Sequence, residues 1–190
     1  MNTRNLFKAV QKGPNEIFFS LLKEAGDVNC RDARGNTPLL VALRKQRYVI
    51  VSYLLDHGAD VCLAGKNGYT PLTVAAYGGS VALCEKLLSL GAEVNACNAY
   101  GCSPLMAAAI TGNVAVVRCL LQHGADASLK NVYGCSACML AHMHGRKNVV
   151  ELLATYGVVL HPTTATVLDR LHESGSVRAA TCKHLKSSFT

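Results

Sequence analysis

The chain repeats one short motif every 33 residues. Gly-Asn-Thr-Pro-Leu at residues 35–39 recurs as Gly-Tyr-Thr-Pro-Leu at 68–72 and as Gly-Cys-Ser-Pro-Leu at 101–105. A fourth copy at 134–138 keeps the spacing, although Ala137 and Cys138 replace Pro and Leu. A repeat period of about 20–50 residues is typical of an array of similar stacked units, each of which contacts mainly its neighbours.

Each copy carries signals that start and end helices. Thr37, Thr70 and Ser103 each place a hydroxyl before a proline, so the hydroxyl can cap a helix whose first position the proline occupies. Apolar residues spaced at i, i+3 and i+4 in 49–55 and 114–121 predict a second helix with one buried stripe. Glycines able to adopt a positive φ then end these second helices at Gly58, Gly91, Gly124 and Gly157.

These motifs resemble those of the ankyrin-repeat family. The resemblance implies an all-α solenoid of helix-turn-helix units with finger hairpins, about four full repeats plus partial capping repeats. We call the extended connection that precedes each first helix a finger loop. The expected boundaries of the single array at residues 1–173 are an N-terminal cap at 1–30, repeats at about 31–63, 64–96, 97–129 and 130–162, and a C-terminal partial helix at 163–173. Residues 174–190 are expected to form a basic tail that is frayed or disordered.

Composition indicates a compartment and excludes a membrane span. No apolar run approaches the ~18 residues of a transmembrane helix, and the first residues lack the layout of a secretory signal. The nine cysteines are an odd number without the close pairing of a disulfide framework, which indicates reduced thiols. We therefore expect a cytoplasmic or nuclear protein, monomeric and without a cofactor.

The net charge of +7 is distributed unevenly. Residues 1–66 carry ten Lys and Arg against six Asp and Glu, residues 67–133 carry three against three, and residues 134–190 carry six against three. The ends are basic and the middle is neutral, without a Lys/Arg block or a nucleic-acid motif. Nucleic acid is thus a disfavoured partner.

The resemblance places partner contacts on one surface, the concave face, formed by the finger loops and the first helices. The residues expected there, with the positions after the finger glycines taken as exposed, are Arg34, Asn36, Arg44, Lys45, Arg47, Lys66, Asn67, Tyr69, Tyr77, Tyr100, Ile110, Thr111, Asn113, Val132, Tyr133, Met143, His144 and Arg146. Arg and Tyr are enriched at interface hot spots. Solvated charges and packed tyrosines on a surface without a partner are the alternative interpretation.

Within this set, Arg44, Lys45 and Arg47 are expected to share one exposed turn at the end of a first helix, where an anionic ligand would relieve their repulsion. The leading hypothesis is a non-catalytic adaptor or scaffold whose partner protein or peptide presents acidic residues beside apolar ones. One alternative is an inhibitor or regulatory subunit of an enzyme such as a protein kinase, as the resemblance to short ankyrin inhibitors suggests. Another is nucleic-acid binding through the basic N-terminal repeats and the tail.

Two kinds of chemistry are disfavoured by the repeat spacing. Cys135 and Cys138 near His142 and His144 look like metal ligands, but Cys138 replaces core leucines and Cys135 replaces finger residues expected to be exposed, so the two sulfurs should not converge. No Cys or Ser is placed beside a His that a carboxylate orients, so no catalytic residues are expected.

Asparagine hydroxylation is suggested by the resemblance alone. Asn29 and Asn95 occupy the finger position that asparaginyl hydroxylases modify in ankyrin domains, each preceded by Val. Cys62 and Ser128 stand at the equivalent positions of two other repeats. The alternative is a finger asparagine that satisfies backbone groups nearby.

Overall fold

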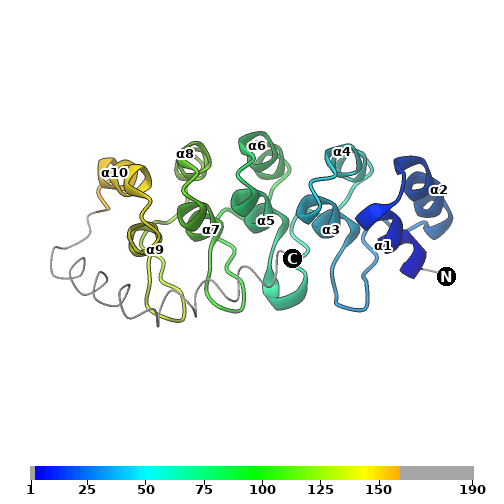
Figure 1. The fold of residues 1–190 in the computed structure, drawn as a ribbon, viewed down its shortest axis with the longest axis horizontal. Coiled ribbons are helices and arrows are strands. Elements are labelled where there is room, and N and C mark those ends of the chain that lie inside the picture. The colour runs from blue at the N-terminus through cyan, green and yellow to red at the C-terminus, as the bar shows by residue number, and fades with distance from the viewer. Residues whose placement is uncertain (1–2, 159–190) are drawn as a thin grey trace.

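The computed structural model describes residues 3–158, which form ten α-helices and one short 3₁₀ turn (Figure 1). The first helices of the successive units are α1 (Thr3–Lys12), α3 (Pro38–Arg44), α5 (Pro71–Gly78), α7 (Pro104–Thr111) and α9 (Ala137–Met143). The second helices are α2 (Asn15–Ala25), α4 (Tyr48–Asp56), α6 (Val81–Ser89), α8 (Val114–Gln122) and α10 (Lys147–Thr155), and the 3₁₀ turn η1 is Lys66–Gly68.

The helices form two parallel rows, with the finger loops projecting on the far side of the first helices (Figure 1). Each first helix packs on its own second helix, and α1, α3, α5 and α7 each also pack on the first helix of the next unit. The described part of the chain is therefore an all-α solenoid, as predicted. The predicted helix at 163–173 and the predicted tail at 174–190 lie outside the described residues.

The predicted helix starts are confirmed. The hydroxyl of Thr37 accepts a hydrogen bond from the backbone N–H of Leu40 at 3.3 Å, and Ser103 does the same for Met106 at 3.3 Å. Thr70 and Ser136 cap α5 and α9 in the same way. Capping satisfies N–H groups that the first turn of a helix leaves without partners, so these hydroxyls fix where each unit begins.

The core runs the length of the array as one continuous layer between the two rows of helices. Leu39, Leu72, Leu105 and Cys138, which are spaced by 33 residues, are each at most 1% exposed. Small residues such as Ala108 are also fully buried, which lets α5, α7 and α9 pack closely. Because neighbouring units share this layer, each unit depends on the next for burial.

Most finger loops close on an Asx side chain at their start. Asp32, Asn98 and Asn131 each accept hydrogen bonds from the backbone N–H groups two and four residues later. The second finger loop has Gly65 at this position and instead forms η1, in which Asn67 adopts a positive φ of 60°. This finger loop therefore has a different backbone from the other three.

None of the helices between residues 3 and 158 is both long and apolar enough to cross a membrane.

Candidate functional site

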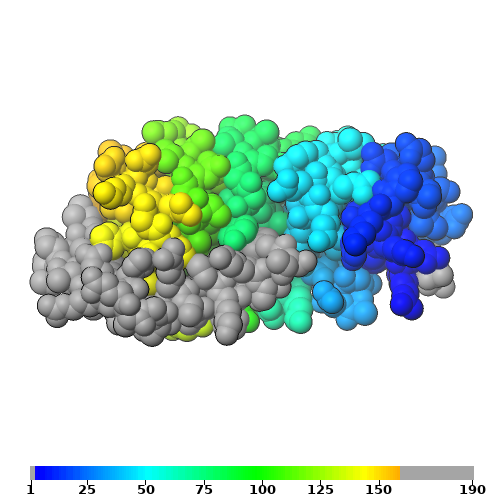
Figure 2. Space-filling model, in the orientation of Figure 1, coloured from blue at the N-terminus to red at the C-terminus, as the bar shows by residue number. Residues whose placement is uncertain are grey.

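A large hollow lies at the N-terminal end of the concave face. A groove of about 890 Å³ runs between α1, the start of the first two finger loops and the end of α3. We call it the N-terminal groove; its lining residues include Arg4, Phe7, Lys8, Asp32, Arg34, Asn36, Val41, Arg44, Lys45, Lys66 and Asn67. Figure 2 shows the blue N-terminal cap packed beside the cyan first full unit.

Six cationic side chains and one carboxylate line the N-terminal groove. The carboxylate, Asp32, is committed to its own loop, because its oxygens accept from the backbone N–H of Arg34 and of Asn36 at 2.8 Å and from the Asn36 side-chain amide. The groove therefore has a strong excess of positive charge, which raises the local concentration of anions.

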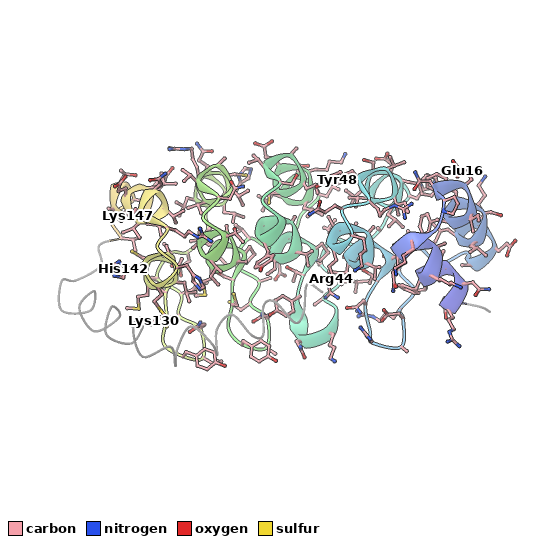
Figure 3. The ribbon with its side chains drawn as sticks, in the orientation of Figure 1. Glu16, Arg44, Tyr48, Lys130, His142 and Lys147 are labelled. Atoms are coloured by element: carbon pink, nitrogen blue, oxygen red, sulfur yellow. The ribbon has the colours of Figure 1, made fainter. Side chains whose placement is uncertain are left out.

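Arg44 is the most enclosed of the six cations. It lies on the finger-loop side of α3 (Figure 3), half-buried, and its Nε is fully enclosed with no hydrogen-bond partner in the described structure. Burial lowers the pKa of the Arg44 guanidinium and the charge of Arg34 lowers it further, whereas Asp32 and Tyr69 oppose that shift. A buried donor without a partner costs free energy, and a nearby anion would stabilise the charge of the guanidinium.

The groove coincides with an unusual junction between finger loops. The second and third loops are joined by a backbone hydrogen bond from Ala99 N–H to the Asn67 carbonyl at 2.9 Å, and Val132 bonds to Tyr100 in the same way. At the first junction the Lys66 N–H instead donates to the Asn36 side-chain oxygen at 3.4 Å. The first two loops are thus held together by side chains rather than by that backbone bond.

Four residues predicted to be exposed on the concave face are buried. Asn36 is 3% exposed, Tyr69 0%, Ile110 6% and Met143 1%, so the prediction that these side chains are exposed was wrong. In each unit the side chain that directly follows the finger glycine is buried rather than exposed. Cys102 and Cys135 follow the same rule and are buried, which corrects their predicted exposure. Ile110 and Met143, near or at the ends of their helices, still face the core.

Three more predicted contact residues hold neighbouring units together. The Arg47 guanidinium donates to the Gly13 carbonyl at 2.8 Å and to Asn15 Oδ1 at 2.6 Å. Asn113 caps α8 and also donates to the Gly79 carbonyl at 2.9 Å, while Arg146 Nε donates to the Ile110 carbonyl at 3.0 Å. Arg47 precedes α4 and is not on the turn of α3, so the predicted cluster reduces to Arg44 and Lys45.

The remaining predicted residues are accessible to different extents. Arg34, Lys45, Lys66, Val132 and Tyr133 are exposed. Those that are half-buried are Asn67, Tyr77, Tyr100, Thr111 and His144. The accessible cations gather around the N-terminal groove, whereas the accessible apolar surface of Val132 and Tyr133 lies on the fourth finger loop. The structure therefore separates a charged region and an apolar region of one face.

Arg4 and Lys8 line the groove although the sequence did not single them out as contact residues. Both side chains are exposed, and they line the groove together with residues of the first finger loop. The excess of Lys and Arg in residues 1–66 was the available signal. Its convergence on one groove depends on how α1 stacks on α3.

The two asparagines named as hydroxylation positions make equivalent contacts. Asn29 Oδ1 accepts from the Asp60 N–H at 2.9 Å, and Asn95 Oδ1 accepts from the Asp126 N–H at 2.8 Å. Each asparagine thus connects its finger loop to the next unit. Their hydroxylation stays a prediction.

Several cysteine thiols are buried, and burial makes them harder to deprotonate. Burial raises the pKa of Cys138 and of Cys135, and it raises the pKa of Cys84 and Cys102 to about 12. Thiols with raised pKa values are poor nucleophiles and poor metal ligands at neutral pH. Within residues 3–158 no group of three or more His, Cys, Asp or Glu side chains is arranged to hold a metal ion.

Comparison with known families agrees with the repeat pattern and the helix pairs. A family model described as ankyrin repeats in three copies matches residues 6–98 and again residues 79–164. A search of curated proteins found no match. Proteins of this family generally serve as protein–protein interaction modules and are typically non-catalytic. With its 33-residue period, capped helix pairs and stacked core, the chain belongs to the ankyrin-repeat family.

Proposed function

We propose that this protein is a non-catalytic adaptor or scaffold that binds a partner protein across the concave face. The observation that carries the proposal is the N-terminal groove, a hollow of about 890 Å³ lined by finger loops and first helices. It offers exposed charged side chains, and its lining also includes Phe7 and Val41, which are 5% and 6% exposed. Interfaces of this kind combine an apolar centre with polar groups at the rim.

The exposed tyrosine of the fourth finger loop supports a partner that covers more than the groove. Tyr133 is 44% exposed and Val132 is 63% exposed, on the same face as Lys45 and Lys66. A partner that reached from the groove to this loop would contact cations at one end and an aromatic ring at the other. The unpaired thiols of the described cysteines fit the reducing environment of the cytosol or nucleus.

Affinity capture with matched variants tests the proposal. The concave-face variant is Lys45→Glu with Tyr133→Ala, and the control is Lys86→Glu with Tyr156→Ala, in which the same two changes fall on exposed residues of the second-helix row. Partners captured by the wild type and by the control, and lost by the concave-face variant, support the proposal. Partners retained equally by both variants contradict it. An effect of the pure protein on the activity of a captured enzyme would identify an inhibitor rather than a scaffold.

A further inference from the structure

The N-terminal groove differs chemically from the rest of the concave face. At the position of Arg44, the next three units carry Tyr77, Ile110 and Met143. Among the four full units, only the first has a guanidinium at this position, and the N-terminal cap has the polar Gln11 there. An arginine here gives up apolar burial and leaves Nε enclosed without a partner in the described structure. A ligand that presents an anionic acceptor to the guanidinium would stabilise its charge.

Besides Lys45, which directly follows Arg44, the exposed cations around Arg44 come from three separate elements. Arg4 and Lys8 belong to α1, Arg34 to the first finger loop and Lys66 to η1 in the second. The other finger loops have Ala33, Ala99 or Val132 at the position of Lys66. The side-chain junction between the first two loops and the turn of η1 together bring this lysine to the groove. The charge is therefore assembled by the fold rather than by a run of sequence.

We infer that the N-terminal groove binds an extended acidic segment of a partner protein, with a carboxylate or phosphorylated side chain seated against Arg44. This inference rests on the proposed function and names its partner chemistry. Arg44 contributes a fixed, partly desolvated donor, and the surrounding cations attract the segment and set its direction. A planar guanidinium suits both carboxylate and phosphate oxygens.

Two other occupants fit the groove less well. Residues 174–190 of this chain carry Arg178, Lys183 and Lys186 and no acidic side chain, so charge disfavours them. A nucleic acid would follow a continuous basic track with aromatic rings for stacking. The basic lining stops at the second finger loop, since residues 67–133 are neutral overall, and the exposed Tyr133 stands on the fourth loop. A short acidic peptide matches the extent of the charge.

The test measures fluorescence anisotropy of a labelled peptide of about twelve residues, enough to cross several units when extended. Its sequence repeats Glu-Glu-Leu, and a second probe carries Gln at every Glu. The protein variant is Arg34→Gln with Lys66→Gln; both side chains are exposed, so the fold should be unaffected. The control is Lys86→Gln with Arg118→Gln, two exposed residues of α6 and α8 with the same change in charge.

The inference predicts that the groove variant binds the Glu peptide about tenfold more weakly than the wild type, whereas the control changes binding less than about twofold. The Gln probe should bind no variant measurably. A phosphoserine version of the probe that binds more tightly than the Glu version would identify phosphate as the preferred anion.

Three results overturn the inference. The first is that the acidic probe does not bind at low ionic strength. The second is that the groove variant and the control lose the same affinity for this probe. The third is that a single-stranded oligouridylate of similar length binds more tightly than the probe and that its binding depends on Arg34 and Lys66. Partner capture could depend on Lys45 and Tyr133 while the affinity for the acidic probe does not depend on Arg34 and Lys66. In that case the proposed function stands and this inference fails.

Discussion

The turn between α3 and α4 and the turn between α7 and α8 have the same place in their units but different chemistry. The first is Arg44-Lys45-Gln46-Arg47 and the second is Ile110-Thr111-Gly112-Asn113. In the second turn every residue suits its position, since Ile110 is buried, Gly112 has a φ of 83° and Asn113 caps α8. It is the turn expected of an array optimised for stability.

The first turn departs from that pattern at three of its positions. Arg44 leaves Nε enclosed without a partner in the described structure, Gln46 adopts a φ of 54° that favours glycine, and Arg47 does not cap α4. Only Arg47 has a structural compensation, through its bonds to the α1–α2 loop. Of these three residues Arg44 lines the N-terminal groove, and residues that are unfavourable for stability are commonly found at functional sites.

The largest expected effect comes from removing the compensating arginine. Arg47→Ala should lower the free energy of unfolding by about 2–3 kcal/mol, because it removes charged hydrogen bonds that join the N-terminal cap to the first full unit. Urea unfolding followed by circular dichroism measures the loss, and hydrogen exchange should show α1 and α2 opening first. The exposed Lys45→Ala serves as control and should stay within about 0.5 kcal/mol of wild type. Equal stability of the two variants would refute a structural role for Arg47.

The second prediction places glutamine, the residue of the first turn at position 46, at the equivalent position 112 of the second turn. Gly112→Gln should cost about 2 kcal/mol, because a side chain is strained at positive φ. A Cβ at this position would also lie 2.6 Å from Arg146 Cδ and disturb the bond of Arg146 to the Ile110 carbonyl. Gly145→Gln is the matched control, with a φ of 66° and no atom within 4 Å of the added Cβ. Gly145→Gln should lower the free energy of unfolding by about half as much in the same measurement. A larger loss in Gly145→Gln than in Gly112→Gln would show that the contact with Arg146 does not cause the cost.

The smallest of the three changes restores the first turn. Gln46→Gly should raise the free energy of unfolding by about 0.5–1 kcal/mol, because glycine adopts the observed φ of 54° without strain. The neighbouring Lys45→Gly should instead lower stability, since Lys45 has a φ of −90° that most residues adopt. Thermal melts of both variants give the comparison. A loss of stability in Gln46→Gly would mean that the glutamine side chain makes a stabilising contact that outweighs its strain.

The sequence predicted the fold because its signals are local. Thr37, Ser103 and the glycines that end second helices act within a few residues of themselves, and the 33-residue period repeats them in register. The helix pairs and their caps therefore follow from the sequence alone.

The site was predicted only in part, because contacts between units depend on side-chain direction. The position after the finger glycine holds Asn36, Tyr69, Cys102 and Cys135, a mixture that looks like variable surface and is buried. Likewise Arg47 and Arg146 look like free surface charges, but their bonding partners lie more than thirty residues away in the preceding units. Lys45, Lys66 and Tyr133 were predicted to be accessible and are exposed.

The central claim is that Arg44 reduces the stability of the first full unit and serves anion binding. Measuring the unfolding free energy and the acidic-peptide affinity of Arg44→Met tests it most directly, because methionine occupies the equivalent position as the buried Met143. We expect the free energy of unfolding to rise by up to about 1 kcal/mol, since the enclosed donor is removed, and the affinity to fall about tenfold. A variant that is less stable and binds the peptide as tightly as wild type would show that Arg44 is a structural residue.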